Sequence, residues 1–105
     1  KKIIGITCHN SLIWVKKAIK ANASYIALGA FYPSKTKRVK KIADIKILKK
    51  IKRYTKIPIV AIGGINSKNY KNLLLNNANF LAISGYIWRN KKYKPLKAIK
   101  TLKWK

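Results

Sequence analysis

Four segments of the sequence contain the residue types that bind phosphate groups, and each of them follows an apolar run. Glycines expose backbone N–H donors, serine and threonine supply hydroxyls, and lysine supplies a point charge. The segments are 7–9 (Thr-Cys-His), 29–37 (Gly29 and Ala30, then Ser34, Lys35, Thr36 and Lys37), 63–64 (Gly-Gly) and 84–85 (Ser-Gly). If the fold brings them to one edge, they predict a phosphate-binding site.

The most informative run is 57–65, Ile-Pro-Ile-Val-Ala-Ile-Gly-Gly-Ile. An unbroken apolar run is typical of a strand that is buried on both faces of a parallel sheet. Gly63 and Gly64 permit positive φ and a close approach to the backbone, and Asn66 or Ser67 is expected to cap a following helix. These residues alone favour a phosphate cradle and an unliganded strand-to-helix turn equally.

The other candidate residues also have structural interpretations. Thr7 suits a strand because it is β-branched, and Cys8 is expected to be a small apolar core residue. For His9, a capping or packing role is favoured over that of a catalytic base. Lys37 lies in a chain rich in lysine, so its position alone does not identify a binding role.

The elements that would position these segments alternate between strand and helix. Apolar runs predict strands at 3–7, 24–30, 57–62 and 79–84, and amphipathic spacing predicts helices at 11–23, 45–54 (Ile47, Leu48 and Ile51 inward), 67–76 and from Pro95 onward (Leu96, Ile99 and Leu102 on one face). Asn10 or Ser11 is expected to cap the first helix, and Asp44 the second. This alternation predicts an α/β fold with a parallel sheet and right-handed crossovers.

Four consecutive β-α units are half of a TIM (β/α)8 barrel, in which ligands bind at the carboxyl ends of the strands. A doubly wound open sheet is the alternative fold. No G-x-G-x-x-G motif follows the first strand, which argues against a dinucleotide-binding version of it. The chain is expected to form one partial domain over residues 1–105.

The charge balance is extreme, because 26 Lys and Arg residues face a single acid, Asp44, for a net charge of +25. Such a field attracts anions, and nucleic acid is the first candidate. However, nearly all of these cations are lysine, which A/T-rich codons favour, and they lie on every predicted helix instead of forming one stripe. Nucleic-acid binding is therefore disfavoured as the main function, whereas small anionic substrates fit.

Composition also limits the cellular context. With one Cys, one His and one Asp, the chain can form neither an internal disulfide nor a metal cluster. No apolar run is long enough to span a membrane, and the N-terminal residues do not resemble a signal peptide. A reducing cytoplasm is expected. The sequence has no methionine, so it is expected to be part of a longer protein.

Taken in order, the motifs resemble the thiamine phosphate synthase family over nearly the whole chain. Residues 4–9 are similar to its Gly-Val-Ser-x-His strand end, and residues 23–37 to its Ala-Asp-Tyr-Val-x-Gly-Pro-x-(Tyr/Phe)-x-Thr-x-Thr-Lys segment. Residues 57–65 resemble its Ile-Pro-(Val/Ile)-Val-Ala-Ile-Gly-Gly-Ile strand, and residues 78–87 its Gly-Ala-Asp-Gly-Val-Ala-Val-(Val/Ile)-Ser-Ala-Ile segment. Four linked motifs at matching spacing are a specific signal.

The resemblance implies the C-terminal half of a barrel enzyme of thiamine biosynthesis. That transferase joins hydroxymethylpyrimidine diphosphate to thiazole phosphate, releases pyrophosphate and forms thiamine phosphate. By resemblance, Lys37 would bind the diphosphate and Thr7 would replace a family serine that contacts the same substrate. The thiazole phosphate would be held by Ser34, Lys35, Thr36, Gly63, Gly64, Ser84 and Gly85.

The sequence departs from the family in ways that bear on activity. Gly85 occupies a position where the family usually has serine. Ala30 occupies a position where the related thiazole tautomerases have a catalytic histidine, and this difference argues against membership of that subgroup. The family's magnesium aspartates belong to the first half of the barrel, and Asp44 is not a counterpart of them. The resemblance therefore implies Mg²⁺ in the parent enzyme, a missing N-terminal half-barrel as partner, and an inactive isolated chain.

Two other functions stay open at this stage. One is a non-catalytic basic module that binds phosphate or nucleic acid. The other is a different phosphate-binding TIM-barrel enzyme that shares the Gly-Gly segment but not the substrates.

Overall fold

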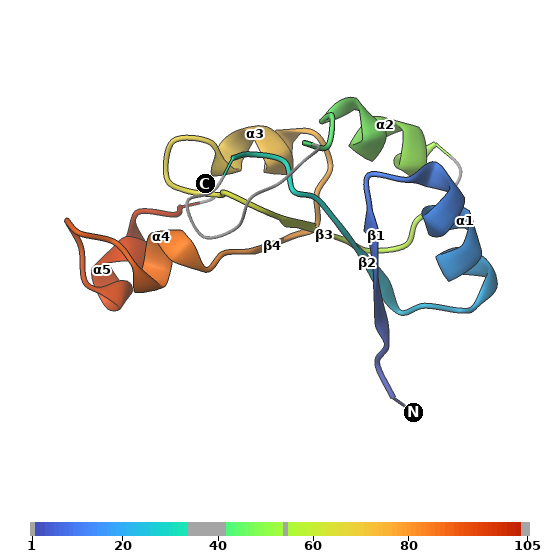
Figure 1. Ribbon diagram of the computed structural model, residues 1–105, viewed down its shortest axis with the longest axis horizontal. Coiled ribbons are helices and arrows are strands. Elements are labelled where there is room, and N and C mark those ends of the chain that lie inside the picture. Colours follow the sequence, from blue (N-terminus) through green and yellow to red (C-terminus); the bar gives the residue numbers. More distant parts are fainter. Residues whose placement is uncertain (1, 34–41, 54, 104–105) are drawn as a thin grey trace.

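The computed structural model describes residues 2–33, 42–53 and 55–103, and within them one parallel sheet carries the fold (Figure 1). Its strands are β1 (Gly5–His9), β2 (Tyr25–Leu28), β3 (Ile59–Ile62) and β4 (Phe80–Ala82), in the order β1-β2-β3-β4. The helices are α1 (Leu12–Lys20), α2 (Lys46–Lys52), α3 (Tyr70–Leu75), α4 (Gly85–Trp88) and α5 (Pro95–Lys100). Parallel strands that follow one another in sequence order are typical of a barrel segment, whereas a doubly wound sheet reverses its order.

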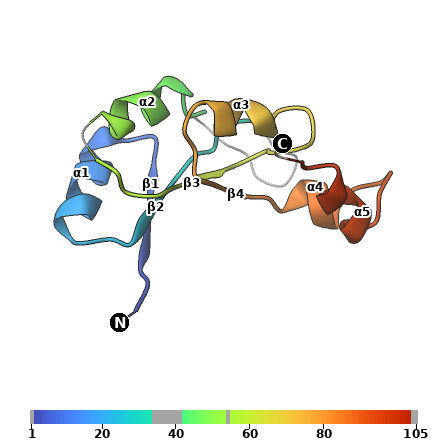
Figure 2. The ribbon, with the colours of Figure 1, turned by 180° about the vertical axis from the view of Figure 1, so that it is seen from behind.

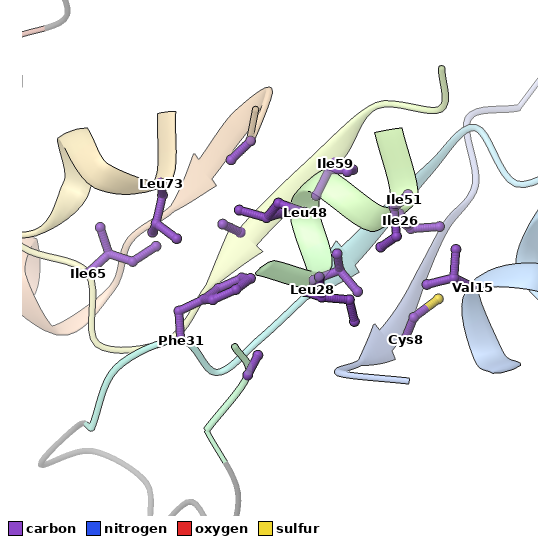
Figure 3. Packing of buried hydrophobic residues seen from close by; sticks show 14 of the residues in the cluster. Cys8, Val15, Ile26, Leu28, Phe31, Leu48, Ile51, Ile59, Ile65 and Leu73 are labelled. Carbon is purple, nitrogen blue, oxygen red and sulfur yellow. The ribbon is translucent and has the colours of Figure 1, made fainter. Parts of the chain in front are cut away.

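The buried face of the sheet packs under α1, α2 and α3. Ile26 pairs with Ile59, and Leu28 with Ala61, and all four side chains are buried. Figure 3 shows Leu48 and Ile51 of α2 over these strands and Val15 of α1 near Cys8. Each large apolar side chain buried here contributes roughly 1.5–3 kcal/mol. The predicted inward face of the second helix is confirmed, since Ile47, Leu48 and Ile51 are all buried.

The opposite face of the sheet is bare within the described residues. One row of paired residues crosses it, with Thr7 opposite Ala27, Ala27 opposite Val60, and Val60 opposite Phe80. Thr7 is exposed and the Phe80 side chain is 60% exposed. In a closed barrel this face would line the interior, where side chains fill the space. A bare apolar row is what half of a barrel leaves uncovered.

Helices α4 and α5 lie beyond β4, away from the other three helices (Figures 1 and 2). The spacing of Leu96 and Ile99 on α5 was expected to mark a packing face. Instead their side chains are 68% and 54% exposed, and Ala98 is the buried residue of this helix. The C-terminal segment then returns to α3, where the Tyr70 hydroxyl donates to the carbonyl of Lys103.

One predicted cap, Ser11, is confirmed, whereas Asp44 lies one residue before the cap position of α2. The Ser11 hydroxyl accepts the N–H of Trp14 at 3.3 Å at the start of α1. The Asp44 carboxylate accepts the N–H of Lys46 at 2.9 Å at the start of α2. Ser11 therefore satisfies an N–H group of α1 that has no intrahelical partner, whereas the cap residue of α2 is Ile45, which makes no side-chain capping bond.

Several predicted boundaries are wrong. The first strand begins at Gly5 instead of residue 3 and reaches His9, and α4 was not expected at all. The third helix was expected from residue 67 with Asn66 or Ser67 as its cap, but α3 begins at Tyr70. The reason is local, because the Asn66 carboxamide accepts the N–H of Lys68 at 2.8 Å and so closes a turn that precedes the helix. No described helix has the length and apolarity that crossing a bilayer requires.

Candidate functional site

The predicted Gly-Gly and Ser-Gly segments leave neighbouring strands at the same edge of the sheet. Ile62, the last residue of β3, pairs with Ala82, the last residue of β4. Gly63 and Gly64 follow the first strand directly, and Ser84 follows the second after one residue. The structure therefore brings these two predicted site segments together at the carboxyl edge, where ligands of parallel α/β sheets bind.

The end of β2 lies directly over the two glycines. The N–H of Phe31 donates to the carbonyl of Ile62 at 3.1 Å, and the N–H of Tyr32 donates to the carbonyl of Gly63 at 3.2 Å. A Cβ atom on Gly64 would lie 2.5 Å from the carbonyl oxygens of Tyr32 and Pro33. Backbone at this distance cannot move aside easily, so the packing of the chain itself requires glycine here, with or without a ligand.

Backbone conformation gives a second reason for the glycines. Gly63 has a φ of 97° and Gly64 a φ of 63°, and both values fall in the region that side chains disfavour. A Cβ on Gly63 would also lie 2.2 Å from the Cβ of Ala30. The glycines are thus explained structurally, and the case for a ligand depends on the direction of their N–H groups.

Three consecutive carbonyl groups at this corner have partners within the protein. Those of Ile62 and Gly63 accept from the β2 end, and that of Gly64 accepts from the Asn69 side-chain amide (Nδ2) at 3.0 Å. In a planar trans peptide the N–H points opposite to the C=O. The N–H groups of Gly63, Gly64 and Ile65 therefore point away from these partners. We refer to these three N–H groups as the glycine nest.

The three N–H groups of the glycine nest have no backbone or side-chain acceptor among residues 2–33, 42–53 and 55–103. Successive N–H groups held in this way form a concave site of positive partial charge. The Ile65 side chain is 4% exposed and packs into the core near Leu73 (Figure 3), which anchors one end of the nest.

Ser84 and Gly85 lie on the β4 side of the same edge. Gly85 is the first residue of α4, and the carbonyl of Ser84 accepts the N–H groups of Ile87 and Trp88 at 3.1 and 3.0 Å. The exposed Ser84 hydroxyl makes no capping hydrogen bond to α4. It can therefore donate to a ligand beside the glycine nest.

Thr7 lies on the bare face but at a distance from the nest. Its row crosses β3 at Val60, four residues before Gly64. Strand spacings near 4.8 Å and a rise near 3.3 Å per residue give roughly 10 Å across the sheet and 13 Å along it. Thr7 and the nest thus belong to separate parts of one surface.

The residues next to Thr7 do not join it in a catalytic group. Cys8 is fully buried, as expected, and burial raises the pKa of its thiol, which disfavours the thiolate nucleophile. His9 is exposed, so it is not the packing residue that was one of its two expected roles. With a φ of 54°, its backbone accepts the N–H of Gly29 at 3.0 Å and links the ends of β1 and β2.

Ser34, Lys35, Thr36 and Lys37 lie outside the described residues. The described chain approaches this segment at the nest, because Pro33 lies against Gly64. On the far side, the N–H of Ala43 donates to the carbonyl of Ala30 at 2.7 Å. Both flanks of the segment are therefore anchored at the end of β2, beside the nest.

The residues present do not fit a magnesium ion. Mg²⁺ is bound through carboxylates and other oxygen ligands, and the chain has one acid, Asp44. Its carboxylate accepts the N–H of Lys46, and it lines a cavity of about 250 Å³ together with Lys46 and Lys50. Among the described residues no three His, Cys, Asp or Glu side chains come together. With one acid against 26 Lys and Arg residues, the chain suits anions better than Mg²⁺.

Two residues at this edge were missed by the sequence analysis. Asn69 donates to the Gly64 carbonyl, and its spacing of three from Asn66 is the spacing of reciprocal capping pairs, a signal that could have been used. Tyr86 on α4 has its hydroxyl 2.5 Å from the Thr101 hydroxyl, and hydrogen bonds from Ser67 and Thr101 lower its pKa. Nothing in the local sequence indicated that Tyr86 would meet both Ser67 and Thr101.

Comparison with known proteins gives one consistent family. A family model described as thiamine monophosphate synthase matches residues 1–87. The thiamine-phosphate synthase of Pelagibacter ubique (strain HTCC1062) is 67% identical over 102 residues, which are 97% of this chain and 49% of that protein. The thiamine-phosphate synthase of Nitrosomonas eutropha (strain DSM 101675 / C91 / Nm57) is 47% identical over 83 residues, 79% of this chain and 39% of that protein.

A solved structure agrees with this result. Thiamine phosphate pyrophosphorylase from Pyrococcus furiosus superposes with a TM-score of 0.79 at 29% identity, covering 94% of this chain and 46% of that chain. The chain spans about half the length of the curated relatives it matches. The prediction of four β-α units from the C-terminal half of a barrel is confirmed.

Proposed function

Because this chain belongs to the thiamine monophosphate synthase family, we propose that it forms the C-terminal half of an enzyme that makes thiamine phosphate. The enzyme joins hydroxymethylpyrimidine diphosphate to thiazole phosphate and releases pyrophosphate. The observation that carries the proposal is the glycine nest beside Ser84, since it offers donors that have no acceptor among the described residues, at the carboxyl edge of a parallel sheet. Residues 1–105 make up a single partial domain of that enzyme.

The glycine nest binds the phosphate of the thiazole substrate. Its N–H groups and the Ser84 hydroxyl donate to phosphate oxygens, and such charge-assisted hydrogen bonds are about twice as strong as neutral ones. Gly85 contributes backbone only. Ser34, Lys35 and Thr36 complete the site, an assignment that rests on the resemblance and on the position of Pro33 beside Gly64.

The pyrimidine diphosphate lies nearer to Thr7 on the same bare face. Lys37 neutralises the diphosphate as its bond to the pyrimidine methylene carbon breaks and the oxygen takes the electron pair. The lone pair of the thiazole nitrogen then forms the new carbon–nitrogen bond. The separation between Thr7 and the nest leaves room for two substrates to meet on this face.

The complete reaction needs more than this chain. The enzymes that this chain resembles use Mg²⁺. Because the chain has a single acidic residue, Asp44, the carboxylate ligands of the ion would come from a segment outside residues 1–105. We therefore expect the isolated chain to bind phosphate compounds without forming thiamine phosphate. The proposed location of the enzyme is the cytoplasm.

A complementation experiment tests the proposal. Residues 1–105 are joined to the N-terminal part of the 67%-identical relative, and thiamine phosphate formation is measured with both substrates and Mg²⁺. The joined protein is expected to be active and the isolated chain inactive. Activity of the isolated chain would contradict the incomplete-site argument, and a folded but inactive joined protein would contradict the assigned reaction.

A second candidate is another phosphate-binding barrel enzyme, because backbone donors recognise the phosphate and not the group attached to it. Thermal unfolding of the joined protein separates the two. Thiazole phosphate is expected to raise the Tm more than an unrelated sugar phosphate at equal concentration. Equal Tm shifts with the two compounds would favour the second candidate and contradict the assignment of thiazole phosphate as a substrate.

A further inference from the structure

The side chain of Asn69 bonds to the glycine corner through both ends of its carboxamide. Its Nδ2 donates to the carbonyl of Gly64 at 3.0 Å, and its Oδ1 accepts the N–H of Asn66 at 2.8 Å. The backbone carbonyl of Asn69 in turn accepts the Tyr32 hydroxyl at 3.5 Å. Asn69 thus connects the turn after β3 with the end of β2.

The carbonyls of Ile62, Gly63 and Gly64 each accept a hydrogen bond, and among the described residues only that of Gly64 accepts it from a side chain. Those of Ile62 and Gly63 are held by backbone N–H groups of the β2 end. Glycine allows wide rotation about its backbone bonds, so the peptide between Gly64 and Ile65 needs a partner to keep its direction. Because this peptide is planar, the atom that fixes its carbonyl also fixes the Ile65 N–H.

Asparagine suits this position chemically. Its carboxamide carries a donor and an acceptor at one branch point, whereas a carboxylate only accepts and an alkyl side chain does neither. Asn69 is half-buried, and it lies on the turn side of the peptide, opposite to the Ile65 N–H. It therefore holds the nest without contacting the bound phosphate.

We infer that Asn69 is a positioning residue of the phosphate site, whose carboxamide holds the Gly64–Ile65 peptide so that the Ile65 N–H faces the phosphate. This inference rests on the proposed function of the glycine nest. It deepens that function by assigning the geometry of the nest to a side chain outside the four phosphate-binding segments.

A graded series of variants tests the inference by binding. Asn69→Ala removes both hydrogen bonds, and Asn69→Ser keeps one polar group that can serve Gly64 or Asn66 but not both. Asn72→Ala is the matched control, because Asn72 is exposed on α3 and its carboxamide meets only the Asn76 side chain, at 3.1 Å. The probes are inorganic phosphate and thiazole phosphate, and the readout is the amide NMR signals of Gly63, Gly64 and Ile65 in the isotope-labelled chain.

In the unchanged chain, both probes are expected to shift all three amide signals. Asn69→Ala is expected to raise the Kd about ten-fold, with the largest loss of response at Ile65, because a misdirected donor forfeits a hydrogen bond to a charged group. The Kd of Asn69→Ser is expected to lie between those of Asn69→Ala and the unchanged chain. The Kd of Asn72→Ala is expected to stay within about two-fold of that of the unchanged chain. Equal Kd values for Asn69→Ala and the unchanged chain would overturn the inference about Asn69 and leave the proposed function standing.

Kinetics of the joined protein separate positioning from stability. Asn69→Ala is expected to raise the KM for thiazole phosphate about ten-fold and to leave the KM for the pyrimidine diphosphate within about two-fold. A purely structural role would lower the amount of active enzyme and leave both KM values unchanged, which would overturn the inference. If the unchanged chain and the joined protein both fail to bind phosphate at the nest, the proposed function falls and this inference falls with it.

Discussion

The backbone N–H of Tyr32 donates to the carbonyl of Gly63 at 3.2 Å, so the end of β2 lies across the glycine corner of β3. This bond turns the carbonyl of Gly63 toward β2 and the N–H of Gly64 away from it. The same contact that excludes a side chain at Gly64 therefore also directs a donor toward the open edge. Packing alone requires glycine at this position, and the proposed phosphate site uses its N–H group.

Gly64→Ala is expected to destabilise the protein by about 1–3 kcal/mol or more, because its φ of 63° is strained for alanine and its Cβ would lie 2.5 Å from two carbonyl oxygens. Urea unfolding of the 105-residue chain checks this value. Gly85→Ala is the control, since Gly85 starts α4 without a positive φ, and it is expected to be neutral or stabilising by up to about 1 kcal/mol. A neutral Gly64→Ala would contradict the close packing of the β2 end.

Asn79→Ala is expected to cost about 1–3 kcal/mol of unfolding free energy, because it leaves polar groups without partners. The Asn79 Oδ1 accepts the backbone N–H of Ile59 at 2.9 Å and the Lys52 ammonium at 2.7 Å, and so connects α2 with the starts of β3 and β4. Equilibrium unfolding against the Asn72→Ala control measures the difference. Equal stabilities would show that water replaces Asn79 without loss.

Tyr86 is expected to ionise at a lower pH than a free tyrosine side chain. Hydrogen bonds from Ser67 and Thr101 lower its pKa from 10.0. Between the lowered folded pKa and 10.0 the unfolded chain binds more protons, so folding stability should rise with pH through this window. Below the folded pKa this contribution is absent.

Ultraviolet absorbance of tyrosinate follows that titration. Tyr86→Phe is expected to remove the earliest ionising phase, whereas Tyr93→Phe, whose ring instead meets the Lys92 ammonium at 5.3 Å, should retain it. If the earliest phase persists in Tyr86→Phe, the contacts of Tyr86 with α5 and Ser67 are not those of the protein in solution.

Cys8 is expected to react slowly with thiol reagents in the native protein. Its side chain is fully buried, and burial raises the pKa of the thiol above 9.0, so little thiolate is present at neutral pH. Reaction with a disulfide dye should accelerate to the rate of a free thiol when urea unfolds the chain. Fast reaction without denaturant would show that β1 opens away from α1.

The sequence predicted well wherever a local pattern decides the structure. Ile47, Leu48 and Ile51 recur at helical spacing, and all three are buried. Leu96 and Ile99 follow the same spacing and do form a helix, but both are exposed because no described segment covers their face of α5, whereas Ala98 on the same helix is fully buried. Periodicity establishes that a face is apolar and leaves open which segment covers it.

The sequence alone determined the four β-α units, the family and the glycine corner, because apolar spacing and glycine pairs are properties of neighbouring residues. Only the tertiary structure decided the direction of the N–H groups of Gly63, Gly64 and Ile65. That direction depends on carbonyl partners from the β2 end and from Asn69. Tyr32 precedes Gly63 by about thirty residues, and no local sequence pattern indicates that the two residues are in contact.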